Sequence, residues 1–146
     1  MKFGPTNQSR NGSSRLQAAA RRSKNPRVVL VDDSKTMLDV LRIHLTGLGL
    51  ELVCIDNPAQ ALVEARWEVP DLIVTDVNMP GMNGIEFCRL LRASGATANV
   101  PVIIVSSRLT EDVRAKATEL GVRVCLQKPV QPHLLQAAVT QVVGAR

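Results

Sequence analysis

Acidic, hydroxyl and amine side chains in this sequence fall at the ends of successive apolar runs. The positions are Asp32-Asp33 after residues 27–31, Asp76 at the end of 72–76, Ser106-Ser107 after 102–105, and Lys128-Pro129 after 122–126. Each side chain alone has an ordinary explanation as a helix cap, a loop hydroxyl or a surface ammonium. Their repeated placement at run ends is hard to obtain by accident, and it indicates one shared site.

Such a set of side chains could handle phosphate if the run ends meet. Three carboxylates in one place repel one another unless a cation lies among them, and oxygen ligands with open positions suit Mg²⁺. The carboxylate of Asp76 could attack phosphorus and form an aspartyl phosphate. Lys128 and Ser106 would offer an ammonium and a hydroxyl to the same anion. The residue types therefore predict Mg²⁺-dependent phosphoryl transfer.

The elements that must bring these residues together alternate along the chain. Five apolar runs, interpreted as strands, lie at 27–31, 51–55, 72–76, 102–105 and 122–126. Amphipathic segments follow them, and the expected helices begin near Ser34, Pro58, Asn83, Thr110 and Pro132. This alternation predicts an α/β fold with a parallel sheet covered on both faces. The carboxyl ends of all its strands would share one edge, where ligands bind.

The spacing of apolar residues also predicts which side chains are buried. They are Met37, Val40, Leu41, Leu45 and Leu48 in the first helix, Ala61, Leu62, Ala65 and Trp67 in the second, and the thiols of Cys54, Cys88 and Cys125. Asn83 is expected to cap the third helix, with Glu86 at capping-box spacing.

The net charge of +5 is unevenly distributed over the 146 residues. Residues 1–26 contain six basic residues and no acid, so the other 12 basic and 13 acidic residues sum to −1. The polar composition of residues 1–26 predicts a disordered basic tail before a folded domain at 27–146. The longest apolar runs fall short of the roughly 20 residues of a membrane span. With an odd number of cysteines, this favours a cytoplasmic protein.

The motifs at the run ends resemble those of the receiver (CheY-like) domain of bacterial two-component response regulators. They are Leu30-Val31-Asp32-Asp33-Ser34, the stretch from Asp76 to Gly84, Val105-Ser106-Ser107 and Lys128-Pro129. The resemblance covers residues 27–143 and implies a flavodoxin-like, three-layer α/β/α fold with five helices. Its five strands would be parallel, in the order 2-1-3-4-5.

The resemblance also implies roles for individual residues. Asp76 would be the phosphoacceptor, Asp33 a direct Mg²⁺ ligand and Asp32 a partly water-mediated one. The backbone carbonyl of Asn78 would complete the protein's share of the metal ligands. By the same likeness Ser106 would be the switch hydroxyl and Lys128 the phosphate-binding lysine, next to an X-Pro bond that is often cis. Asn78 and Arg108 occupy positions that tune hydrolysis of the acyl phosphate.

Two positions depart from the family pattern. Cys125 stands where the family usually has Tyr or Phe, and Val130 stands where an aromatic often follows Lys-Pro. A thiol is too small to fill the pocket that opens when Ser106 moves toward phosphate. We therefore expect the signal to travel through the 106–111 loop and the helix that follows it.

The resemblance implies a stand-alone receiver that takes phosphoryl from a sensor histidine kinase or a histidine phosphotransfer protein docked beside Asp32-Asp33. A downstream protein would read the fourth helix, fifth strand and fifth helix. No DNA-binding domain is expected, and a phosphorylation-dependent homodimer stays open. In one alternative the basic tail binds the partner and the receiver gates it. In another the chain is a phosphatase, although such enzymes commonly have an acid at the position of Asn78.

Overall fold

The computed structural model describes residues 25–144, and the expected basic tail therefore lies almost entirely outside the described residues. Its five parallel strands form one sheet in the order β2-β1-β3-β4-β5. They are β1 (Arg27–Val31), β2 (Glu51–Ile55), β3 (Leu72–Thr75), β4 (Val102–Ser106) and β5 (Val124–Gln127). The predicted strand order and parallel direction are confirmed.

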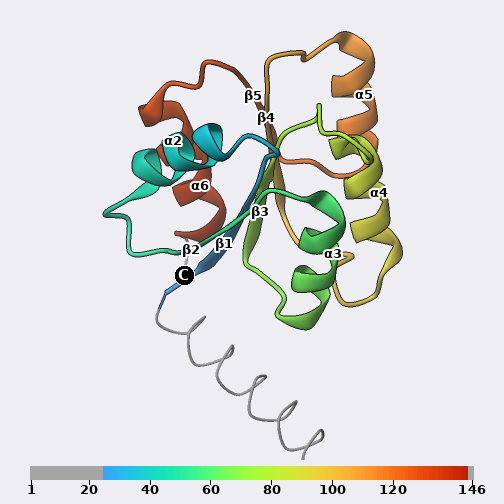
Figure 1. Cartoon of the computed structure of the whole chain (residues 1–146), viewed down its shortest axis with the longest axis horizontal. Coiled ribbons are helices and arrows are strands. Elements are labelled where there is room, and N and C mark those ends of the chain that lie inside the picture. The colour runs from blue at the N-terminus through green and yellow to red at the C-terminus, as the bar shows by residue number, and fades with distance from the viewer. Residues whose placement is uncertain (1–24, 145–146) are drawn as a thin grey trace, which may run out of the picture.

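Helices cover both faces of the sheet (Figure 1). They are α2 (Lys35–Leu45), α3 (Pro58–Trp67), α4 (Gly84–Ala93), α5 (Glu111–Glu119) and α6 (Pro132–Val143). The helices α2 and α6 pack on one face, and α3, α4 and α5 on the other. Each face has its own core, built around Phe87 and Leu91 on the α4 side and around Leu41 and Leu135 on the α2 side. The predicted three-layer fold is confirmed.

Side-chain caps mark the start of α2, α3, α4 and α5. Ser34, Asn57, Asn83 and Thr110 each accept a hydrogen bond from the backbone N–H three residues on. Such a cap satisfies a donor that the helix itself leaves free. Asn83 receives its hydrogen bond from the N–H of Glu86 at 2.9 Å, as the capping-box spacing predicts.

The predictions of burial were partly wrong. In α2 the buried residues are Leu38, which was not predicted, Leu41 and Leu45. Met37 and Val40 are only half-buried, and Leu48 lies beyond the helix and is exposed. Cys54 is exposed because β2 is an edge strand. Trp67 is 60% exposed, since it is the last residue of α3 and points away from the core.

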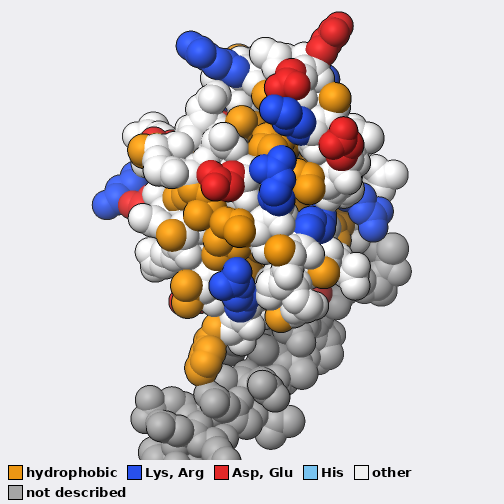
Figure 2. Space-filling model, turned by 90° about the vertical axis from the view of Figure 1, so that its right-hand side faces the viewer, with side chains coloured by type: hydrophobic (Ala, Val, Ile, Leu, Met, Phe, Trp, Pro, Cys, Tyr) orange, Lys and Arg blue, Asp and Glu red, His pale blue; other side chains and the backbone are white. Residues whose placement is uncertain are grey.

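The fifth strand begins two residues later than predicted. The N–H of Val122 donates to the carbonyl oxygen of Ala117 at 2.9 Å, so Val122 belongs to the turn that ends α5. Within residues 25–144, no helix has the length and apolar character needed to cross a membrane. On the face formed by α3, α4 and α5, hydrophobic side chains lie among charged ones of both signs (Figure 2).

Candidate functional site

Strand pairing places the predicted site residues at one edge of the sheet. The N–H of Asp32, directly after β1, donates to the carbonyl of Ile55, and the N–H of Asp76, directly after β3, donates to that of Val31. On the neighbouring strands, the N–H of Lys128 donates to the carbonyl oxygen of Ser106 at 2.9 Å. The run ends therefore meet, as the parallel sheet predicts.

The acidic and amine side chains converge in space. One carboxylate oxygen from each of Asp32, Asp33 and Asp76 lies within 4.8 Å of the others. The Nζ atom of Lys128 is 2.9 Å from Oδ2 of Asp32 and 3.2 Å from Oδ2 of Asp76. The side chains of Asp32 and Asp76 are only 2% and 9% exposed, while Asp33 is open to solvent. The pocket is thus acidic, half-enclosed and reachable from outside.

Backbone groups hold the Asp76 carboxylate in one orientation. Its Oδ1 accepts hydrogen bonds from the N–H of Val77 at 2.7 Å and, more weakly, from that of Asn78 at 3.4 Å. Gly84, the first residue of α4, packs against this segment, and its N–H donates to the carbonyl of Val77. A Cβ atom at Gly84 would overlap the carbonyl oxygen of Asp76 and lie 2.8 Å from Cα of Val77. The turn therefore needs glycine at this position.

The charges in the pocket shift two pKa values. Burial raises the pKa of the Asp32 carboxyl, against the lowering effects of the Ser34 N–H and the Lys128 ammonium, and the charge of Asp76 adds to the rise. Burial would lower the pKa of Lys128, but hydrogen bonds and charge from Asp32 and Asp76 outweigh it, so that pKa is raised. Lys128 therefore stays protonated, and its ammonium pairs with the carboxylates of both Asp32 and Asp76.

These residues fit a hard divalent cation. Three carboxylates face one ammonium, so the pocket carries excess negative charge, and its donors are all oxygen atoms. This donor set suits Mg²⁺, which binds through one or two carboxylates and keeps several waters. Asp32, Asp33 and Asp76 would hold the ion. That the backbone carbonyl of Asn78 is a further ligand of the ion stays a prediction.

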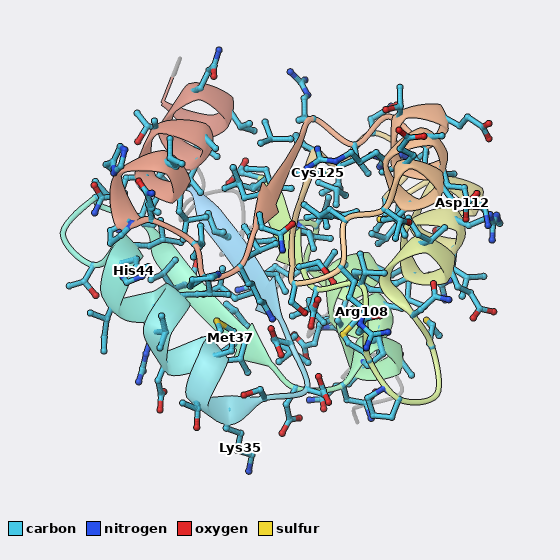
Figure 3. All side chains as sticks on the ribbon, turned by 90° about the horizontal axis from the view of Figure 1, so that it is seen from above. Lys35, Met37, His44, Arg108, Asp112 and Cys125 are labelled. Carbon is cyan, nitrogen blue, oxygen red and sulfur yellow. The ribbon has the colours of Figure 1, made fainter. Side chains whose placement is uncertain are left out.

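The predicted switch and tuning residues lie on the strands and loops that border this pocket. Ser106 is fully buried, and its Oγ accepts a hydrogen bond from the N–H of Arg108 at 3.3 Å. In the view onto this end of the sheet, Arg108 lies on the α4 and α5 side and Lys35 at the opposite, α2 side (Figure 3). Cys125 is half-buried on β5 and packs against the core under α3, α4 and α5. Asp56 instead pairs with Lys35 at 3.9 Å, outside the acidic group.

Sequence reasoning missed the residues that shape the pocket through their backbone. The N–H of Ser34 donates to Oδ1 of Asp32 at 2.9 Å, and the N–H of Val77 to Asp76. Backbone donors leave no mark in residue type, so these contacts had no signal. Gly84 did have one, because glycine as the first helical residue after a cap is a poor helix former and indicates close packing.

The five-stranded parallel sheet with an acidic pocket at the carboxyl ends of its strands is that of a two-component receiver domain. The family described as "Response regulator receiver domain" matches residues 28–140, and the chain belongs to this family. Members are phosphoacceptor switches that bind Mg²⁺ at an acidic pocket.

Known proteins of this kind are similar to the chain along most of its length. The "DNA-binding response regulator MtrA" of Mycobacterium tuberculosis is 37% identical over 114 residues, which are 77% of this chain and 48% of MtrA. The chain thus spans about half the length of the MtrA relatives it matches. "Protein PilH" of Pseudomonas aeruginosa is 32% identical over 118 residues, 81% of this chain and 98% of PilH. The structure of the Vibrio cholerae chemotaxis protein CheY4 has a TM-score of 0.75 at 26% identity, covering 81% of this chain and 98% of that one.

Proposed function

We propose that Asp76 accepts a phosphoryl group from the phosphohistidine of a sensor histidine kinase or a histidine phosphotransfer protein. A carboxylate oxygen of Asp76 attacks phosphorus, the P–N bond breaks, and the imidazole leaves and takes a proton from water. Hydrolysis then releases inorganic phosphate and restores the carboxylate. The observation that carries the proposal is the meeting of Asp32, Asp33 and Asp76 around the Lys128 ammonium.

The residues of the pocket supply what the transfer requires. Bound Mg²⁺ would offset the negative charge of the incoming phosphoryl group and of the carboxylates. Lys128 is already 3.2 Å from Oδ2 of Asp76, so its ammonium can follow the phosphoryl oxygens without moving far. The Val77 N–H fixes the carboxylate before the reaction, which lowers the entropic cost of positioning it.

A small phosphodonor tests this assignment directly. Incubation with phosphoramidate and Mg²⁺ should add one phosphoryl group to the intact protein, and EDTA should prevent the addition. Asp76→Asn should abolish it, while Asp56→Asn, which removes an acid at the end of edge strand β2, should leave it unchanged. Equal labelling of Asp76→Asn and the wild type would show that the phosphoacceptor lies elsewhere.

We propose that the phosphorylated state is read by a separate partner protein at the face formed by α5, β5 and α6. The match to almost the whole of PilH supports a receiver that works through such a partner. Phosphate would favour one of two conformations, and a partner that prefers that conformation would shift the balance further. The same face could instead join two copies, which sedimentation with and without phosphodonor would distinguish. This function places the protein in the cytoplasm, where histidine kinases present their phosphohistidine.

The contacts of Ser106 support a route for the signal through the 106–111 loop. Its hydroxyl is hydrogen-bonded to the backbone of Arg108, so a shift of Ser106 toward phosphate pulls on the loop that leads into α5. Cys125 offers a small thiol in place of an aromatic ring. Cys125→Tyr should therefore enlarge the effect of phosphate on partner affinity. A wild-type response already as large as that of the variant would contradict this route.

A second candidate function rests on the uneven charge. Residues 1–26 carry +6 and the rest of the chain −1, so the basic segment itself could bind an acidic partner while the receiver gates access. Charge reversal at Lys2 and Arg10 separates the two functions. A partner read by the receiver face would bind unchanged, and a partner held by the basic segment would be lost.

A further inference from the structure

A cluster of carboxylates surrounds one arginine at the end of the sheet where β1 begins. Arg27 is 5% exposed, and Nη1 lies 3.1 Å from Oε2 of Glu51 and 3.5 Å from Oε1 of Glu68. Its Nη2 lies 3.7 Å from Oε2 of Glu64, and its backbone N–H donates to Oδ2 of Asp71 at 2.8 Å. We call Glu51, Glu64, Glu68 and Asp71 the acidic cluster. Together with Arg27 these side chains sum to −3.

The carboxyl end of α3 strengthens this negative potential. The helix ends at Trp67, and its last carbonyl groups carry the negative end of the helix dipole, which favours cations. Arg66 in the last turn offsets one charge. The sum for the acidic cluster, Arg27 and Arg66 is therefore −2.

A small apolar surface lies next to the acidic cluster. Val63 and Trp67, four residues apart in α3 and therefore on one side of it, are 64% and 60% exposed. Each directly precedes a member of the cluster, Glu64 or Glu68, so an apolar stripe and an acidic stripe run side by side along the helix. Val63 and Trp67 thus form a small apolar patch bordered by charge, which suits contact with an amphipathic segment. This helix lies on the face shown in Figure 2.

The chain enters the domain beside this surface. The carbonyl of Pro26 accepts from the N–H of Glu51 at 2.8 Å, and the carbonyl of Arg27 accepts from the N–H of Asp71 at 2.8 Å. Pro26, near the start of the described residues, therefore lies next to the acidic cluster. In the sequence, Arg21, Arg22 and Lys24 precede Asn25 by at most four residues, and four residues span about 14 Å of extended chain.

We infer that residues 15–24 of this chain dock on the surface formed by Val63, Trp67 and the acidic cluster. The segment has four basic residues and no acid, which matches the charge of the cluster. It also carries Leu16, Ala19 and Ala20 at spacings that would form one apolar side of a helix, suited to the apolar stripe of α3.

Covalent attachment favours this occupant over a free partner. A short connection holds the segment at an effective concentration on the order of millimolar, so even weak ion pairs and a small apolar contact populate the docked state. The surface repels nucleic acid and anionic lipid, because both carry negative charge. The docking surface is also separate from the α5, β5 and α6 face, so docking is compatible with the proposed phosphorylation switch and does not depend on it.

Fluorescence of the full chain tests the inference, because Trp67 is the only tryptophan. The probe is acrylamide, a neutral quencher that the charges in the segment do not attract. The wild type at low salt should show blue-shifted emission and protection from quenching, relative to the charge-reversed variant Arg21→Glu/Arg22→Glu/Lys24→Glu. In about 1 M NaCl, where the Debye length is about 3 Å, the wild type should approach the variant. Loss of three surface ion pairs should lower the ratio of docked to undocked molecules about tenfold, or about 1.4 kcal/mol.

Two controls decide the outcome. Lys2→Glu/Arg10→Glu reverses charges outside residues 15–24 and should keep the wild-type emission. Val63→Lys puts a basic side chain on the docking surface and should release Trp67 as the triple variant does. Identical emission and quenching of the wild type and the triple variant at every salt concentration would overturn the inference. So would a blue shift that appears only as protein concentration rises, because the occupant would then be the segment of a second copy.

Discussion

The exposed carboxylate of Asp33 should destabilise the metal-free protein, and Asp33→Asn should relieve this cost. Its oxygen lies within 4.8 Å of the carboxylates of Asp32 and Asp76. At that distance two unit charges in a water-like dielectric repel by about 0.9 kcal/mol, or about 1.7 kcal/mol for both pairs. The Lys128 ammonium offsets part of this repulsion. We therefore expect Asp33→Asn to raise the free energy of unfolding in EDTA by about 1 kcal/mol, and Tm by about 3 °C.

Magnesium should reverse the order of the two proteins. If Asp33 is a ligand, Mg²⁺ at 100 times its Kd stabilises the wild type by about 2.7 kcal/mol. The Asn variant has lost one carboxylate from the donor set and should gain far less at the same concentration. Urea unfolding of both proteins, with EDTA and with Mg²⁺, gives the four free energies that are needed.

A matched substitution shows whether the effect belongs to the pocket. Asp112→Asn removes an exposed acid of α5 that pairs with Lys116 at 3.1 Å, and it should change stability by only a few tenths of a kcal/mol in either buffer. Destabilisation of the protein by Asp33→Asn in EDTA, or an equal gain of both proteins from Mg²⁺, would show that Asp33 neither repels the other carboxylates nor binds the ion.

Three further predictions follow from packing and burial. Gly84→Ala forces a Cβ atom against the backbone of Asp76. It should lower the free energy of unfolding in urea by about 1–3 kcal/mol and slow phosphorylation. A variant as stable and as active as the wild type would contradict this. Arg92 donates hydrogen bonds to three backbone carbonyls at 2.7–3.2 Å. Arg92→Ala should therefore lower the free energy of unfolding in urea by about 3 kcal/mol. A loss below about 1 kcal/mol would show that water replaces these bonds. Burial raises the pKa of the Cys88 thiol to about 12. At pH 8 an aromatic disulfide reagent should therefore label exposed Cys54 first, and Cys88 only when the protein unfolds. Early labelling of Cys88 would contradict its burial.

The sequence predicted the pocket because its residues stand at strand ends. An apolar run followed by Asp76 or Lys128 indicates both a strand and the residue at which it ends. In a parallel sheet these strand ends share one edge, so the side chains that follow them meet there. The start of α4 could also be predicted from the sequence, because Asn83 and Glu86 have the spacing that a helix cap requires.

What the sequence did not predict depends on the tertiary structure: which strand lies at the edge of the sheet, where a helix ends, and which distant carbonyl groups a polar side chain reaches. Cys54 lies in an apolar run like the other strands, but β2 has a neighbour on one side only, and its thiol is exposed. Trp67 has the spacing of a buried residue, but α3 ends there. The side chain of Arg92, on α4, donates hydrogen bonds to the carbonyls of Ala98, Val100 and Leu120. Such long-range contacts of one polar side chain leave no periodic pattern in the sequence.

We propose that Asp76 is phosphorylated inside a pocket that it forms with Asp33, Ser106 and Lys128. Beryllofluoride, a mimic of the phosphoryl group, added with Mg²⁺ to isotope-labelled protein tests it most directly by amide chemical shifts. We expect large shifts at Asp76, Ser106 and Lys128, extending into α5 and α6, and none for Asp76→Asn. An unchanged wild-type spectrum, or shifts that persist in Asp76→Asn, would contradict it.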